Sequence, residues 1–202
     1  MKSGPMAFMR GLTFPGGQQP VIRGERVYLR YPRVPDYLQW SKLRGESRAF
    51  LSPWEPQWAR DELTKGAFRR RLKRYAYEAR NDTAYAFFVF RKEDETLLGG
   101  CTLSNVRRGV TQCCTLGYWI GERFARKGYM QDAIRALLPF IFQTLGLHRI
   151  EAACLPSNEP SKSLLIKTGF KQEGLARRYL QINGEWQDHV LFALLADEAP
   201  VG

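Results

Sequence analysis

The sequence predicts an α+β (mixed α/β) fold, a single domain in which a central, mostly antiparallel sheet is flanked by helices. Three observations lead to this prediction. Apolar and polar residues alternate in residues 26–31 and 111–121, which is the period of a half-buried strand. The period changes to that of a helix directly after residue 121. The chain then closes with two alternating segments around Asn183-Gly184, a pair typical of β-hairpin turns.

The first half of the chain predicts a strand, two helices and a hairpin, in that order. Residues 26–31 alternate as a strand, Pro35-Asp36 opens a helical pattern, and a second helix is expected from about Asp61. Residues 50–56 contain two prolines and are expected to form a stiff loop between the helices. The charged residues 93–95 are expected to join strands at residues 84–91 and 97–104.

The second half predicts a strand at residues 111–121, followed by the clearest helix of the chain. Its apolar face is formed by Tyr129, Ala133, Ile134, Leu137, Leu138, Ile141 and Phe142. A short strand is expected at residues 149–155, and a helix at residues 160–168 that Gly169 closes. The terminal hairpin comprises residues 170–182 and 185–195.

Length and composition predict one domain, residues 21–198, after a mobile N-terminal tail of residues 1–20. The chain has 202 residues, of which 44% are apolar, so it can bury a sizeable core. The densest apolar stretch, residues 84–90, is far shorter than the roughly 20 residues of a membrane helix. Glycine and proline interrupt the first residues, so no signal peptide is expected there. We therefore expect a cytoplasmic protein with no membrane partner.

The cysteines and histidines predict no metal site. The four cysteines form no CxxC pair, and the chain has only two histidines, so no metal-ligand spacing is present. We expect the cysteines to be buried thiols within strands. Asp188-His189 in the last strand is interpreted as a structural hydrogen-bonding pair in preference to a catalytic dyad.

The positive charge predicts a polyanionic partner, which composition alone leaves open among nucleic acid, a membrane surface and a phosphorylated cofactor. The formal net charge is +11. The second helix carries a run of five cations, Arg69, Arg70, Arg71, Lys73 and Arg74. This run is either a solvated helix face or a surface that docks on ribosomal RNA.

The strand-to-helix junction at residues 121–130 is the strongest candidate for a phosphate site. A helix N-terminus exposes unpaired N–H groups, and here it is preceded by Arg126, Lys127 and Gly128. Gly128 permits close approach of the backbone to a pyrophosphate, and the two cations add charge at the rim. The alternative is an ordinary surface turn with solvated cations.

Further segments follow this junction in a fixed order: a strand at residues 149–154, an Asn-led helix at residues 158–165 and the return at residues 168–174. With the junction, they resemble the GNAT family of acetyl-CoA-dependent N-acetyltransferases. The resemblance implies that the junction, from Gly121 through Tyr129 and Met130, cradles the cofactor pyrophosphate. It also implies that the helix led by Asn158 borders the thiol end of the cofactor.

Residues 50–56, 104–109, 116–121 and 179–191 narrow the resemblance to the ribosomal-protein-alanine N-acetyltransferases, the RimJ/RimL group, and to its RimJ branch in particular. This resemblance implies acetyl transfer to a protein N-terminal α-amine, typically that of a ribosomal protein with N-terminal Ala. Two departures stand out. Ala125 and Met130 replace two residues of the family's phosphate-loop pattern, and Leu180 occupies the position where RimL-like members carry a glutamate.

The candidate catalytic groups are chosen by the chemical steps that acetyl transfer requires. A backbone N–H between Gly117 and Gly121 could polarise the thioester if this strand splays, with Trp119, Ile120 and Gly121 as the lining. Ser161 is either the acid for the leaving thiolate or a helix-capping residue, and capping is the preferred interpretation. Glu55, Glu122 or a backbone carbonyl could act as base through water. Trp54 is either a wall of the acceptor site or a loop anchor.

Two other functions stay open at this point. One is acetylation of a small-molecule amine, which a basic protein suits poorly when the amine is polycationic. The other is a non-catalytic RNA-associated or ribosome-associated module that keeps the fold and uses its charge.

Overall fold

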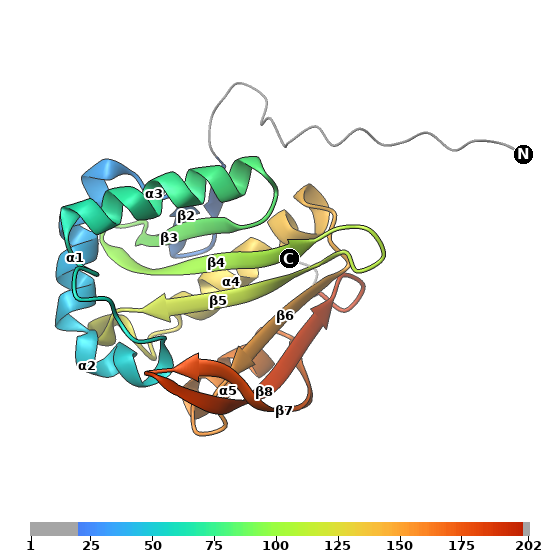
Figure 1. Ribbon diagram of the computed structural model, residues 1–202. Helices are drawn as coiled ribbons and strands as arrows, with labels where there is room; N and C mark the ends of the chain where they lie inside the picture. Colours follow the sequence, from blue (N-terminus) through green and yellow to red (C-terminus); the bar gives the residue numbers. More distant parts are fainter. Residues whose placement is uncertain (1–19, 200–202) are drawn as a thin grey trace, which may run out of the picture.

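The eight strands form one sheet with helices on both faces, in the computed structural model that describes residues 20–199 (Figure 1). The strand order is β1-β2-β3-β4-β5-β6-β8-β7. Only β5 and β6 pair in parallel, and the other neighbours are antiparallel. The predicted α+β class with a mostly antiparallel sheet is therefore confirmed. Residues 1–19 of the expected tail lie outside the described residues.

The strands are β1 Val21–Arg23, β2 Val27–Arg30, β3 Tyr85–Arg91, β4 Leu97–Arg107, β5 Cys113–Ile120, β6 Arg149–Cys154, β7 Lys171–Ile182 and β8 Glu185–Leu195. The helices are α1 Tyr37–Glu46, α2 Arg48–Leu51, α3 Lys65–Arg80, α4 Tyr129–Pro139 and α5 Glu159–Lys167. No helix within residues 20–199 is long and apolar enough to cross a membrane.

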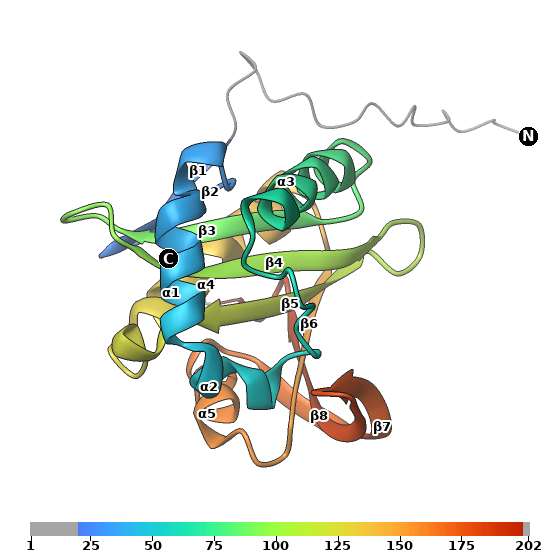
Figure 2. The same cartoon turned by 60° about the vertical axis from the view of Figure 1, so that its left-hand side comes forward.

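Helices α1 and α3 cover one face of the central strands, and α4 covers the other (Figures 1 and 2). Successive residues of a strand point to opposite faces, and β3 shows both contacts. The Phe68 ring of α3 lies 6.3 Å from the Phe88 ring, whereas Phe140, directly after α4, lies 5.5 Å from Phe87. This explains why β3 is apolar without alternation, because both of its faces are buried.

Strands β5 and β6 separate after a short parallel contact. They pair only from Cys113 to Thr115 of β5, opposite Arg149 to Glu151 of β6. Beyond Thr115, β5 continues to Ile120 along β4 alone, so its other edge has no strand partner among the described residues. The edge of β5 that faces β6 is therefore open over Gly117–Ile120. This is the separation of strands that an unpaired N–H for the thioester requires.

Three boundaries differ from the prediction. The expected loop at residues 50–56 is helical as far as Trp54, because Pro53 occupies the start of a 3₁₀ turn, where its missing N–H costs nothing. Helix α3 begins at Lys65 and not near Asp61, since the Thr64 hydroxyl caps it by accepting from the Ala67 N–H. Helix α4 ends at Pro139 and continues as a π-helical turn, Phe140–Thr144.

The N-terminal strand β1 was missed, because three residues are too few to show a period. The prediction for the thiols is confirmed. Cys101, Cys113, Cys114 and Cys154 are free, buried and within strands.

Candidate active site

The junction between β5 and α4 has the geometry of an anion site. Gly128 is the N-cap of α4 with φ 81°, a left-handed conformation that glycine adopts without strain, and Arg126 is also left-handed with φ 59°. The first intrahelical bond runs from the Asp132 N–H to the Gly128 carbonyl, and no side chain of the described residues caps the helix. The first-turn N–H groups are therefore free to bind a phosphate.

Arg26 reaches this junction from the turn between β1 and β2. Its guanidinium donates to the Lys127 carbonyl at 3.2 Å and lies 5.0 Å from the centre of the Tyr129 ring. A Cβ placed on Gly128 would meet the same guanidinium at 2.8 Å. The Asp132 carboxylate accepts the Arg26 backbone N–H at 2.6 Å and so anchors the turn. This cation was not predicted from the sequence, because an arginine on the polar side of a strand carries no local signal.

Gly121 and Met130, both predicted to line the cofactor, have packing roles that the sequence does not reveal. A Cβ on Gly121 would lie 2.3 Å from Cδ1 of Leu43, so only glycine fits against α1. The Met130 side chain is buried, with its sulfur 3.5 Å from the Cys101 Sγ. Only the backbone of Met130 can therefore reach a bound phosphate.

Where β5 and β6 separate, two hydroxyls meet. The Tyr118 OH lies 2.7 Å from the Ser161 Oγ, and the Ser161 N–H donates to the Asn158 Oδ1 at 3.1 Å. The preferred interpretation of Ser161 as the helix cap is thus wrong, because Asn158 is the N-cap of α5. Burial raises the pKa of Tyr118, which therefore remains protonated at neutral pH. Tyr118 lies within the strand predicted at residues 111–121, where the sequence predicted no role for it in the site.

A cavity of about 430 Å³ lies on the face of the sheet that α1 and α3 cover. Its floor is formed by β3, β4 and β5, and its walls by α1, α3 and residues 55–62. Trp119 also lines the cavity, and its indole lies over Gly100. A Cβ atom placed on Gly100 would be 2.7 Å from the Nε1 of this indole. The cavity therefore reaches the stretch of β5 that has an open edge.

Glu55 lies in this cavity and is held by three donors. Arg44 donates to both carboxylate oxygens at 2.7 and 2.8 Å, and the Trp58 Nε1 donates at 2.8 Å. The Arg44 guanidinium lies 4.3 Å from the Trp58 ring and 4.9 Å from the Trp119 ring. Trp58 lines the cavity, whereas Trp54, which was either a wall of the acceptor site or a loop anchor, does not.

Glu122 and the pair Asp188-His189 do not line this cavity. Glu122 borders a separate depression of about 190 Å³ with Glu46, Ser47 and Arg123. Asp188 accepts the Arg178 N–H, and the His189 Nδ1 bonds the Gln187 carbonyl. Each side chain therefore bonds to its own backbone group, and the two side chains do not bond to each other.

A free helix N-terminus beside two separated strands, with a cavity on the other side of β5, fits the class of acetyl-CoA-dependent acyltransferases that the resemblance indicated. A family model described as an acetyltransferase (GNAT) domain matches residues 26–171. The chain therefore belongs to the GNAT family of acetyltransferases.

Two relatives and one solved structure are particularly similar. The "Probable N-acetyltransferase YjcK" of Bacillus subtilis is 34% identical over 87% of this chain and 97% of that protein. The "[Ribosomal protein uS5]-alanine N-acetyltransferase" of Escherichia coli is 35% identical over 84% of this chain and 88% of that protein. The structure of "Mycobacterium smegmatis RimJ in complex with CoA-disulfide" has 33% identity and a TM-score of 0.82, and covers 91% of this chain and 88% of that one.

Proposed function

We propose that this protein transfers the acetyl group of acetyl-CoA to the N-terminal α-amine of a protein, a ribosomal protein with N-terminal Ala in particular. With such an acceptor it would work in the cytoplasm. The observation that carries the proposal is the meeting of two sites at β5, the phosphate-type junction and the cavity floored by Gly117 and Trp119. The similarity to an enzyme named for the alanine of a ribosomal protein supports the choice of acceptor.

The cofactor would be held by its phosphates at the junction. The N–H groups of Gly128, Tyr129 and Met130 would bind the pyrophosphate, with Arg126, Lys127 and Arg26 as surrounding cations. Asn158 would keep α5 in place beside the thiol end. Acetyl-CoA supplies an activated acyl group, and no residue of this chain needs to form a covalent bond to it.

The open edge of β5 would bind the carbonyl oxygen of the thioester. An N–H between Gly117 and Gly121 would donate to that oxygen, and Trp119, Ile120 and Gly121 would line the acyl site. The Ser161 hydroxyl would donate toward the leaving sulfur as its negative charge develops, while the Tyr118 hydroxyl donates to the Ser161 Oγ. In this arrangement Ser161 would be the acid and Tyr118 its hydrogen-bond partner.

The acceptor amine would enter through the cavity on the other face. An α-amine has a pKa of about 8, so about a tenth of it is neutral at pH 7, whereas a lysine amine near 10.4 is almost entirely charged. Glu55 is one of the two carboxylates that line the cavity, and through a water it could take a proton. Arg44 and Trp58 already donate to the oxygens of Glu55, and an α-amine needs little help from a base.

Intact-mass measurement of candidate peptides incubated with acetyl-CoA tests this proposal. We expect Ala-first peptides to gain one acetyl group, Ser-first peptides to react more slowly, and peptides with a blocked N-terminus and a free lysine to react poorly. Turnover of the blocked peptide at the rate of its free counterpart would contradict the proposal and favour a lysine or small-amine acetyltransferase.

A further inference from the structure

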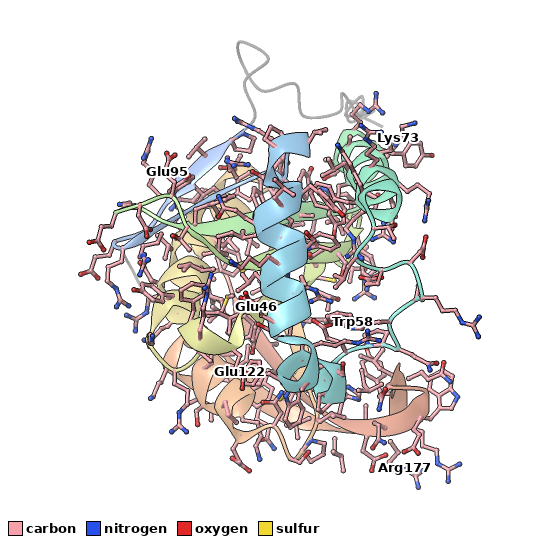
Figure 3. All side chains as sticks on the ribbon, turned by 90° about the vertical axis from the view of Figure 1, so that its left-hand side faces the viewer. Glu46, Trp58, Lys73, Glu95, Glu122 and Arg177 are labelled. Carbon is pink, nitrogen blue, oxygen red and sulfur yellow. The ribbon has the colours of Figure 1, made fainter. Side chains whose placement is uncertain are left out.

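The basic run of α3 divides between two sides of the helix. Arg71 and Arg74 line the cavity beside Trp58 and Trp119. Arg69 and Lys73 are exposed, form no ion pair within residues 20–199, and do not line it. Figure 3 shows Lys73 on the side of α3 away from Trp58. The run is therefore not one uniform surface, because part of it belongs to the acceptor cavity.

The charges inside the cavity do not balance. Its charged lining consists of three arginines and two glutamates. Arg44 is paired with Glu55, and Arg71 is paired with Glu62. Arg74 has only a loose contact of 3.6 Å with Glu78, which lies outside the cavity, and 60% of its side chain is exposed. Arg74 is therefore the cavity cation whose hydrogen-bond donors remain available for a ligand.

The surroundings of the mouth are also basic. Arg48 is exposed, with its guanidinium 5.4 Å from the Trp58 ring, and it forms no ion pair in the described chain. Figure 3 shows Trp58 between α3 above and the hairpin that carries Arg177 below. A chain that enters here with its amine directed toward β5 would pass these cations with its following residues.

We infer that the preferred acceptor carries an acidic side chain shortly after its N-terminal residue, and that Arg74 pairs with that carboxylate. This inference rests on the proposed function and adds the class of acceptor sequence. An extended chain advances about 3.3–3.6 Å per residue, so the partner of Arg74 lies among the first residues behind the amine. Opposite charge at this rim strengthens encounter and binding, whereas a lysine in the same place is repelled.

Docking on ribosomal RNA is the alternative for the same cations, and the position of Arg74 favours the peptide. An RNA backbone would bind all exposed cations of the helix in the same way. A peptide in the cavity would contact only the exposed cation that lines the cavity, Arg74. Arg74 and Lys73 are neighbours of equal charge on the same helix. Lys73 is therefore a matched control for Arg74.

The test measures kcat/KM of the full chain at about 0.15 M salt for Ala-first peptides that differ at one position. That position, from the second to the fifth residue, carries Glu, Gln or Lys. We expect the Glu peptide to exceed the Lys peptide by about fivefold at the best position, mainly through KM, and the ratio to shrink at high salt. Arg74→Glu should reverse this preference, and Lys73→Glu should keep it, with thermal melting to confirm that both variants fold.

Three outcomes would overturn the inference. Equal kcat/KM values for the Glu and Lys peptides would overturn the inference. The proposed function would still stand in that case if the Gln peptide is acetylated. Loss of the preference in Lys73→Glu as large as in Arg74→Glu would indicate a diffuse polyanion surface, and therefore RNA. Failure to acetylate any of the peptides would contradict the proposed function, and this inference with it.

Discussion

The cofactor junction and the acceptor cavity are built in different ways. The junction is almost contiguous in sequence, since residues 121–130 provide all of it except Arg26. The cavity is assembled from α1, α3, three strands and residues 55–62. A contiguous site follows local rules of helix capping and glycine conformation, whereas an assembled site depends on the tertiary fold. This is why the sequence indicated the first and not the second.

The largest expected effect is on the acceptor side, where a buried charge depends on its partner. Glu55→Ala leaves Arg44, whose side chain is 7% exposed, without its carboxylate, and should lower the free energy of unfolding by about 3 kcal/mol. Denaturant unfolding measures this loss. Asp61→Ala removes the partner of Arg70, which is 67% exposed, and should cost less than about 1 kcal/mol. A Glu55→Ala protein of unchanged stability but lost activity would instead identify Glu55 as a base.

Between the two sites, the hydroxyl pair should affect the chemical step. Ser161→Ala and Tyr118→Phe should each lower kcat by about tenfold to a hundredfold with little change in the KM for acetyl-CoA. The kcat of the double variant should be no lower than that of the less active single variant, because the two hydroxyls act as one unit. Asn158→Ala should instead cost about 1 kcal/mol of stability by removing the cap. A lower melting temperature with unchanged kcat in Ser161→Ala would refute its catalytic role.

On the cofactor side we expect a smaller, purely binding effect. Gly128→Val should raise the KM for acetyl-CoA several-fold, because the side chain would strain the backbone and displace Arg26. Arg26→Ala should raise it less. Gly109→Val is the control, since Gly109 also has positive φ, 66°, but has open space around it and lies away from the junction. An unchanged KM in folded Gly128→Val would remove the phosphate site from this junction.

The pH dependence belongs to the acceptor and requires no change in the protein. As pH rises, kcat/KM should increase with the neutral fraction of the α-amine and level off near its pKa of about 8. The raised pKa of Tyr118 keeps its proton in place over this range, so it should cause no decline. A pH–rate profile with a further ionisation near the ordinary range of carboxylates would indicate a dedicated base.

Most of the fold was predictable because periodicity is local. The strands at residues 26–31 and 111–121 and the terminal hairpin agree with β2, β5 and β7–β8 to within a few residues. The misses have local causes as well. The three residues of β1 show no period, and Pro53 was interpreted as a loop residue although it starts a 3₁₀ turn.

The acceptor cavity was not predictable as a whole, although Glu55 and Trp119 were named as site residues. Glu55 was a candidate base, but nothing in the sequence pairs it with Arg44, which looks like an ordinary basic residue of a helix. Arg74 was interpreted only as one of five similar cations. The contacts that distinguish these residues exist only after α1 and α3 pack on the sheet.

The central claim is that the cavity delivers an α-amine to the open edge of β5. A single peptide with both a free N-terminal Ala and an internal Lys, incubated with acetyl-CoA and analysed by tandem mass spectrometry, tests it most directly, because both amines compete in one molecule. We predict acetylation on the N-terminal amine with the lysine left free. Acetylation mainly on the lysine would contradict the account.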